Sequence, residues 1–222
     1  MRVEMKTERI SFLYRKLVIA SLLIGILLNL KNTMFIEFLL SYYTMWSNLL
    51  CLVFFLFLEI KKHNDQEKNW YYILKGEITM AILLTFVIYL VGLLPKNLPM
   101  YHVSPFDRGI TSKQVANILV HIVSPLLVVG DYYFDKKGNL KYYYPVIWLI
   151  FPSLYVSFVY SGKGKFYGIG GSRKYAYYFL DYEKLGIHKV MLYIAGIAIA
   201  IIVVGIILVF LDKKLAKRKF NN

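Results

Sequence analysis

Long runs of apolar residues, separated by short polar segments, divide the chain into blocks. Six blocks cover residues 13–30, 38–60, 71–94, 112–134, 143–160 and 188–211. Each is close to the roughly 20 helical residues that cross a hydrocarbon core about 30 Å thick. A segment in lipid must satisfy its own backbone hydrogen bonds, as a helix does. The pattern therefore predicts an all-α polytopic membrane protein, with six transmembrane helices in a single bundle over residues 1–222.

Composition supports the same class of protein. Apolar residues make up 58% of the 222 residues, and the mean hydropathy is +0.52. The blocks use most of the chain, so no sizeable soluble domain is expected. The first block is expected to remain as a span, because no clear small-residue cleavage site follows it. The lone Cys51 lies inside an apolar block, which excludes a disulfide framework.

The chain is strongly basic, with a net charge of +14 from 27 Lys+Arg and 13 Asp+Glu. Nucleic-acid binding and membrane topology are the two interpretations of such a charge. The basic residues lie in short segments between the blocks, which favours orientation signals and contacts with anionic lipids over nucleic acid. The side that carries both termini has 17 basic residues and the other side has 10. A multi-pass protein of the cell membrane with both termini cytoplasmic is therefore predicted.

The longest connection, residues 161–187, is predicted to lie outside. It carries five of the ten basic residues of that side, and a sixth, Lys189, follows at the start of the last block. Its first part, GKGKFYGIGG, lacks the GxxxxGK[ST] spacing of a phosphate-binding loop, and no strand precedes it. A flexible loop is the better interpretation. The tyrosines of the following YAYYFLDY are expected at the level of the lipid headgroups.

Polar residues are costly inside a membrane, so their positions are informative. In the second and fourth blocks they fall on one face of a helix, within about 120° and 100° at 100° per residue. The second block contributes Ser41, Thr44, Ser47, Asn48 and Cys51, and the fourth contributes Gln114, Asn117, His121, Ser124 and Asp131. Both stripes are expected to face the interior of the bundle.

The depths of these residues can also be compared. Thr44 and His121 lie about 9 Å and 13 Å below the outer boundary at 1.5 Å per residue. Tyr155 in the fifth block has a similar depth, and Tyr89 and Thr85 near the outer end of the third block could join them. The sequence thus predicts a polar pocket in the outer half of the bundle.

Pro125 is predicted to kink the fourth helix. It has no backbone N–H to donate to the carbonyl of His121, four residues back. The kink would leave a free acceptor beside the imidazole. Pro152 is expected to free the carbonyl of Trp148 in the fifth helix in the same way.

Two interpretations of the polar stripes stay open. A single histidine in a membrane helix often joins helices by hydrogen bonding, and a membrane threonine often bonds the carbonyl one turn back. A chemical role for His121 and Thr44 is the alternative. The four histidines have no metal-binding spacing, and neither HExxH nor a cysteine cluster is present, so no metal or other cofactor is predicted.

Three segments carry a resemblance to a known family. They are YYTMWSNLL at the start of the second block, ANILVHIVSPLLVVGDYYF in the fourth and YYYPVIWLIFPSLYVSFVYSGKG in the fifth. In their combination and order they resemble the androgen-induced-gene-like family, and most closely its bacterial six-span relatives. The resemblance covers most of the chain, from the second block to the sixth.

The resemblance implies an intramembrane hydrolase of fatty-acid esters, with Thr44 of YYTMWSN as the nucleophile and His121 of LVHIVSP as the base. A lipid or fatty-acid ester is then the expected substrate. Asn48 and Asn117 are candidate oxyanion donors, with Ser47 and Tyr155 as further supporting residues. A transporter or binding protein for a small amphiphile and an acyltransferase are the alternatives.

Overall fold

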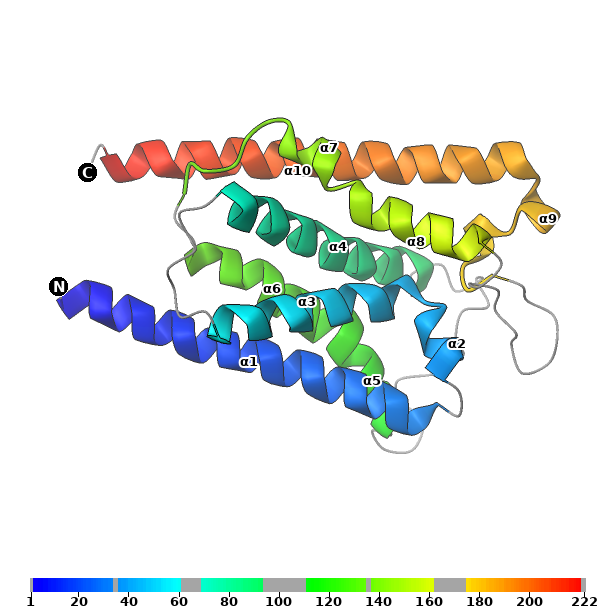
Figure 1. Cartoon of the computed structure of the whole chain (residues 1–222), viewed down its shortest axis with the longest axis horizontal. Coiled ribbons are helices and arrows are strands. Elements are labelled where there is room, and N and C mark those ends of the chain that lie inside the picture. Colours follow the sequence, from blue (N-terminus) through cyan, green and yellow to red (C-terminus); the bar gives the residue numbers. More distant parts are fainter. Residues whose placement is uncertain are drawn as a thin grey trace. The chain divides into compact units, whose positions relative to one another are not determined.

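The computed structural model describes residues 2–33, 36–60, 69–93, 111–134, 137–161 and 175–220. In these residues every regular element is a helix (Figure 1). The elements are α1 (Arg2–Asn32), α2 (Ile36–Leu40), α3 (Tyr43–Ile60), α4 (Asn69–Leu93), α5 (Ser112–Ile118), the π-helical turn η1 (Leu119–Val123), α6 (Ser124–Asp131), η2 (Tyr132–Phe134), α7 (Tyr144–Ile147), α8 (Ile150–Tyr160), η3 (Tyr178–Leu180), α9 (Tyr182–Leu185) and α10 (Ile187–Phe220). The predicted all-α fold is confirmed.

Within the described residues, five helical stretches are long and apolar enough to cross a membrane. They are Arg9–Asn32, Tyr43–Ile60, Asn69–Val91, Ser112–Asp131 and Ile187–Lys217. These stretches fall on five of the six predicted blocks. The remaining block, 143–160, forms the shorter apolar stretch Tyr144–Tyr160, which is about 25 Å long at 1.5 Å per residue.

The block at 38–60 is interrupted near its start, which the hydrophobic pattern does not predict. It begins as α2, turns at Ser41 and Tyr42, and continues as α3. Thr44 therefore lies in the first turn of a helix and not in the middle of one. Backbone N–H groups in a first turn have no acceptor within their own helix.

The block at 143–160 is also interrupted. α7 ends at Ile147, and α8 begins at Ile150 after a turn at Trp148 and Leu149. Pro152 then occupies the first turn of α8, where a missing backbone N–H leaves no helical bond unmade. The predicted break at Pro152 thus takes the form of a new helix start.

The helices pack as two compact units. The first unit comprises Met1–Leu39, Thr44–Asn64 and Ile82–Asp135, and the second comprises Leu40–Tyr43, Asp65–Ala81 and Lys136–Asn222.

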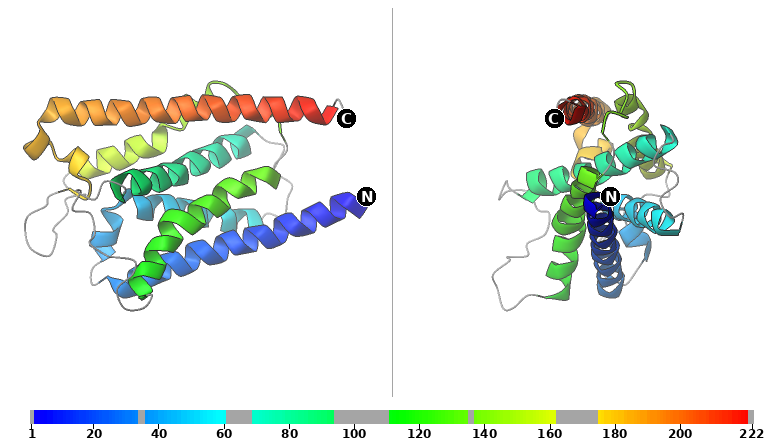
Figure 2. Two further views of the ribbon diagram at one scale, coloured as in Figure 1. Left: turned by 180° about the vertical axis from the view of Figure 1, so that it is seen from behind. Right: turned by 90° about the vertical axis from the view of Figure 1, so that its left-hand side faces the viewer.

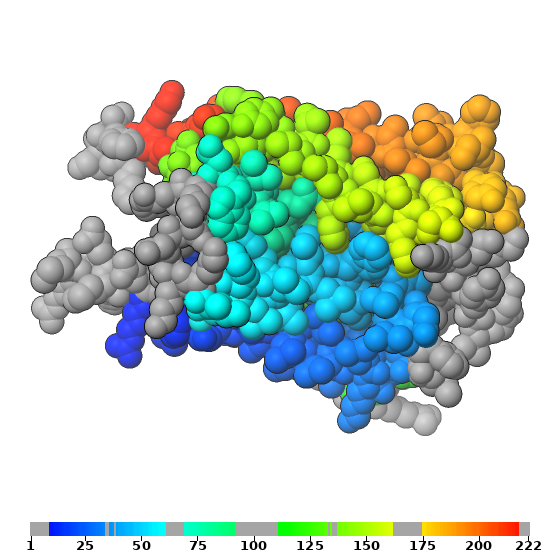
Figure 3. Space-filling model, viewed as in Figure 1, coloured from blue at the N-terminus to red at the C-terminus, as the bar shows by residue number. Residues whose placement is uncertain are grey.

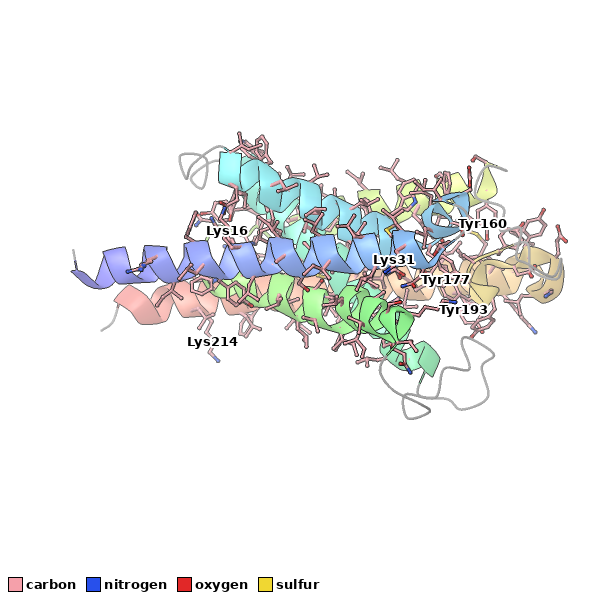
Figure 4. All side chains as sticks on the ribbon, turned by 90° about the horizontal axis from the view of Figure 1, so that it is seen from below. Lys16, Lys31, Tyr160, Tyr177, Tyr193 and Lys214 are labelled. Atoms are coloured by element: carbon pink, nitrogen blue, oxygen red, sulfur yellow. The ribbon has the colours of Figure 1, made fainter. Side chains whose placement is uncertain are left out.

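In the first unit α1 is antiparallel to α3 and α5. Lys16, near the middle of α1, pairs with Glu59 at the end of α3, with 2.6 Å between Nζ and Oε2. The two helices adjoin in the space-filling view (Figure 3). Lys31 lies in the last turn of α1 (Figure 4). There, Asn32 accepts a hydrogen bond of 2.8 Å from the hydroxyl of Ser112, the first residue of α5.

Small residues bring α1 close to the fourth block. A Cβ atom at Gly25 would lie only 2.9 Å from Cγ1 of Val120 in η1, so a larger residue would push the helices apart. One turn earlier, the buried hydroxyls of Ser21 and Ser124 are 2.7 Å apart. These contacts support the π-helical turn from one side.

A buried ion pair lies at the other end of the contact between α1 and the fourth block. Nε of Arg15 is 3.4 Å from Oδ1 of Asp131, and the two side chains are 5% and 0% exposed. Buried charges of this kind are tolerated when they are paired. Asp131 belongs to the polar stripe that is expected to face the interior of the bundle, and its burial agrees with that expectation.

In the second unit, Trp148 joins the first half of α4 to the turn between α7 and α8. Its ring packs so closely on Gly76 that a Cβ atom there would lie 2.0 Å from Cζ2. Its Nε1 donates to the carbonyl of Ile73 over 3.0 Å. Glu77, also buried, accepts a hydrogen bond from the backbone N–H of Phe151 over 3.2 Å. The first half of α4 and α8 therefore run in the same direction.

The last helix, α10, packs antiparallel to α7 and α8. A Cβ atom at Gly205 would meet Pro145 at 2.7 Å. Near the end of α10, the carboxylate of Asp212 accepts the backbone N–H groups of Gly138 and Leu140 over 2.9 and 3.0 Å. At the other end, Tyr160 donates from its hydroxyl to the carbonyl of Leu180 over 2.8 Å.

The tyrosines that precede α10 form a packed aromatic cluster. Tyr160, Tyr177 and Tyr193 gather at the same end of the second unit (Figure 4). Tyr175 and Tyr177 are 5% and 4% exposed. The rings of these two tyrosines fill a protein interior, and the expected headgroup level of the tyrosines in this segment stays a prediction. Residues 162–174 of the same loop lie outside the described part of the chain.

Candidate functional site

Thr44 occupies a first helical turn that its neighbours hold in place. Its carbonyl accepts the hydroxyl of Ser47 over 3.0 Å and Nδ2 of Asn48 over 2.8 Å. In a helix each side chain leans towards the N-terminus. The Thr44 hydroxyl is consequently directed to the open end of α3.

Two further contacts connect this turn to neighbouring helices of the first unit. The Ser47 hydroxyl lies 2.7 Å from that of Thr85 in the second half of α4. Nδ2 of Asn48 also donates to the carbonyl of Val120 in η1 over 3.1 Å. Both Ser47 and Asn48 are fully buried. The nucleophile candidate therefore lies on a backbone held from two sides.

His121 lies in the middle of η1. The helix before it begins with a capping box in which Thr111 and Gln114 exchange backbone and side-chain hydrogen bonds. In η1 the pitch widens, and the N–H of Ser124 donates to the carbonyl of Leu119, five residues back. Such π-helical turns are rare and occur frequently at functional sites. The segment from α5 to α6 changes direction along its length (Figure 2).

The predicted kink at Pro125 thus takes the form of a π-helical turn directly before the proline. Pro125 is buried and stands near the start of α6, where its missing N–H is tolerated. Sequence reasoning missed the π-helical pitch, which has no simple residue signature.

The side chains of Thr44 and His121 meet. Oγ1 of Thr44 is 3.1 Å from Nε2 of His121, within hydrogen-bonding distance, as the facing and depth of the two residues predict. Both side chains are half-buried. The contact joins α3 to η1 within the first unit.

The other ring nitrogen fixes the direction of this hydrogen bond. Nδ1 of His121 is 3.0 Å from the backbone carbonyl of Asn117. A carbonyl oxygen only accepts hydrogen bonds, so a neutral imidazole must carry its proton on Nδ1. Nε2 is then the acceptor, and the Thr44 hydroxyl donates to it. This is the arrangement of a general base poised to deprotonate a hydroxyl nucleophile.

Tyr89 covers one face of the imidazole. The two ring centroids are 4.3 Å apart and the planes are inclined by 20°. The Tyr89 hydroxyl accepts a hydrogen bond of 3.0 Å from Nδ2 of Asn117. The depth estimated from the sequence places Tyr89 near the predicted polar pocket, but it gives no indication that the Tyr89 ring stacks on His121.

The structure brings most of the predicted site residues together. Ser47, Asn48 and Asn117 each touch the pair or the backbone that carries it. Tyr155 belongs to the second unit, where its hydroxyl donates to the carbonyl of Ser41 over 2.7 Å. Nδ2 of Asn48 donates to two carbonyls, so in this conformation Asn48 acts on the position of Thr44 and not as an oxyanion donor.

In the described part of the chain no carboxylate touches the imidazole. Among the same residues, no group of three or more His, Cys, Asp or Glu could hold a metal ion. The chemistry that these residues can perform on their own is therefore proton transfer and nucleophilic attack.

Comparisons with protein-family models, with curated proteins and with solved structures found no match to the chain.

Proposed function

We propose that the chain is an intramembrane hydrolase of lipid esters, with Thr44 as nucleophile and His121 as general base. The observation that carries the proposal is the hydrogen bond from Thr44 to Nε2 of His121, with Nδ1 of the same ring held by the Asn117 carbonyl. The resemblance to the androgen-induced-gene-like family supports the same two roles.

The reaction has two steps. His121 takes the hydroxyl proton on Nε2 as Oγ1 of Thr44 attacks the ester carbonyl. The tetrahedral intermediate expels the alcohol, which receives that proton from the imidazolium, and an acyl-threonine remains. A water molecule then attacks the acyl group with His121 again as the base. The acid leaves, and the proton returns to Thr44.

The negative charge of the intermediate forms beside the first turn of α3. Backbone N–H groups there have no acceptor within the helix, and the helix dipole favours an anion at this end. Asn117 has a second amide hydrogen besides the one given to Tyr89. These donors suit an oxyanion better than Asn48 does.

We further propose that the chain crosses the cell membrane six times, with the Tyr144–Tyr160 stretch as the fifth span. Its length is close to the hydrocarbon thickness, and flanking residues can extend a short span to the interface. The helix directions within each unit support this number. In the first unit α1 is antiparallel to α3 and α5, and in the second the first half of α4 runs with α8 and against α10.

The same topology places the Thr44–His121 pair in the outer half of the membrane with both termini cytoplasmic. Thr44 lies at the start of α3, whereas Glu59 and its partner Lys16 lie at the other end. A site at this depth can receive a lipid from the side and still reach water. The basic residues at the cytoplasmic ends would contact anionic lipids.

A fluorophosphonate probe tests the enzyme reaction on purified protein in lipid nanodiscs. We expect covalent labelling, with the adduct mapped to Thr44 by mass spectrometry. Thr44→Ala should abolish it, Thr44→Ser should retain it, and His121→Gln should slow it about 100-fold or more. The double variant should lose no more than the single ones, because the two residues act as a unit.

Two matched variants control for nonspecific damage. Thr79 is a buried threonine whose hydroxyl bonds the carbonyl of Lys75 over 2.7 Å, and His188 is exposed at the start of α10. Thr79→Ala and His188→Gln should label at the wild-type rate. Full labelling of Thr44→Ala, or an adduct on another residue, would rule out the proposed nucleophile.

Turnover separates the hydrolase from the acyltransferase. A long-chain fatty-acid ester in mixed micelles should release free acid in water. If no free acid is released, and the acyl group appears in a new ester only after an alcohol is added, the reaction is acyl transfer.

A further inference from the structure

The orientation of the imidazole depends on more than its two hydrogen bonds. The Thr44 hydroxyl rotates, and a ring held only at Nδ1 and Nε2 can still tilt about the line between its partners. Tyr89 removes this freedom, because its ring lies nearly parallel to the imidazole at a centroid distance of 4.3 Å. In the first unit this contact comes from a third helix, α4, which carries neither member of the pair.

Tyr89 is itself held in position. Its hydroxyl accepts Nδ2 of Asn117 over 3.0 Å, and the backbone carbonyl of the same Asn117 accepts Nδ1–H of His121. The three residues therefore form a closed loop of two hydrogen bonds and one ring stack. A displacement of His121 would have to break at least one of these contacts.

The stack also suits the chemistry. An aromatic face attracts a cation that forms above it. In the proposed reaction the imidazole becomes positively charged when it accepts the Thr44 proton. In the described residues no carboxylate lies at Nδ1 to balance this charge. The π-face of Tyr89, stacked on the imidazole, would stabilise it instead.

We infer that Tyr89 is a positioning residue for His121: its stacked ring holds the imidazole with Nδ1–H on the Asn117 carbonyl and Nε2 towards Thr44. The inference rests on the proposed function for its catalytic consequence. The structural part of the inference is that the His121 ring has a fixed orientation and a fixed tautomer. This part does not depend on any activity.

The first test reads the tautomer directly. In protein labelled with ¹⁵N-histidine, the His121 signals are those that His121→Gln removes. We expect one neutral form with the proton on Nδ1 in the wild type and in Tyr89→Phe, which keeps the ring. Tyr89→Leu should give a mixture of tautomers. A wild-type ring protonated on Nε2, or a Tyr89→Leu spectrum identical to the wild type, would overturn the inference.

The second test uses the fluorophosphonate probe and separates reversible binding from the rate of covalent reaction. Tyr89→Leu should lower the rate constant for inactivation about 10-fold or more, since small displacements of a catalytic group cost about this much. The binding constant of the probe should stay within about twofold, and Tyr89→Phe should restore most of the rate. A loss of binding with an unchanged rate constant would contradict a positioning role.

Phe86→Leu is the matched control, because it removes an aromatic ring one turn earlier on α4. It should change neither the tautomer nor the inactivation rate. The two proposals can fail separately. A wild-type protein that never labels at Thr44 refutes the hydrolase, and the ¹⁵N spectra still decide the role of Tyr89.

Discussion

A neutral nucleophile and base suit a membrane interior better than a charged triad. A carboxylate behind the imidazole would have to be desolvated at a cost of several kcal/mol. In the proposed site the backbone carbonyl of Asn117, 3.0 Å from Nδ1 of His121, would take that place and fix the same tautomer without a charge. The carboxylate of Asp131 is instead kept apart from the pair and matched by Arg15.

Glycine positions allow a sharp test of packing at the residue scale. Gly76→Ala should lower the thermal stability of the protein, because the new Cβ atom would lie 2.0 Å from the Trp148 ring. Overpacking of this kind costs about 1–3 kcal/mol or more. Thermal unfolding followed by tryptophan fluorescence in detergent measures the loss. The control is Gly196→Ala in α10, where nothing lies within 4 Å of the added atom. Equal melting temperatures for both variants would contradict the packing.

At the scale of single elements, the π-helical turn sets the position of His121. Pro125→Ala supplies a backbone N–H that can bond the carbonyl of His121, which favours an α-helical pitch there. The imidazole would then move relative to Thr44. We expect labelling of Thr44 by the fluorophosphonate probe to fall about 10-fold while the protein stays folded by size-exclusion chromatography.

Pro152→Ala is the matched control for this change. It lies in the first turn of α8, where a proline interrupts no helical hydrogen bond, so the labelling rate should be unchanged. A folded Pro125→Ala variant that labels as fast as the wild type would show that the turn does not position the base.

Sequence could predict the long helices and the facing of the pair, because both follow from simple periodicities. Apolar length predicts the spans, and rotation by 100° per residue places Thr44 and His121 on inward stripes. The turn at Ser41 and the π-helical pitch around His121 were not predictable in this way. They depend on contacts between distant segments, such as Gly25 against Val120. The stacking of Tyr89 likewise needs the packing of α4, which no local pattern specifies.

At the scale of the whole molecule, the number of membrane crossings determines on which side of the membrane the termini and the candidate site lie. An even number of spans puts both termini on one side, whereas five spans would separate them. For six spans, the positive-inside rule with 17 basic residues against 10 predicts cytoplasmic termini. Accessibility of single cysteines to a membrane-impermeant maleimide in intact cells distinguishes these topologies.

The native Cys51 is buried and is removed first as Cys51→Ala. In that background Arg9→Cys, Lys184→Cys and Lys217→Cys report on the start of the chain, the last loop and the end of α10, and all three positions are exposed. We expect Lys184→Cys alone to react in intact cells, and all three to react after permeabilisation.

Reaction at one of Arg9→Cys and Lys217→Cys but not the other would mean an odd number of crossings, with Tyr144–Tyr160 the segment that fails to cross. Reaction at both of them but not at Lys184→Cys would keep six spans and invert them. The Thr44–His121 pair would then lie in the cytoplasmic half of the membrane, with its ester substrate drawn from the inner leaflet.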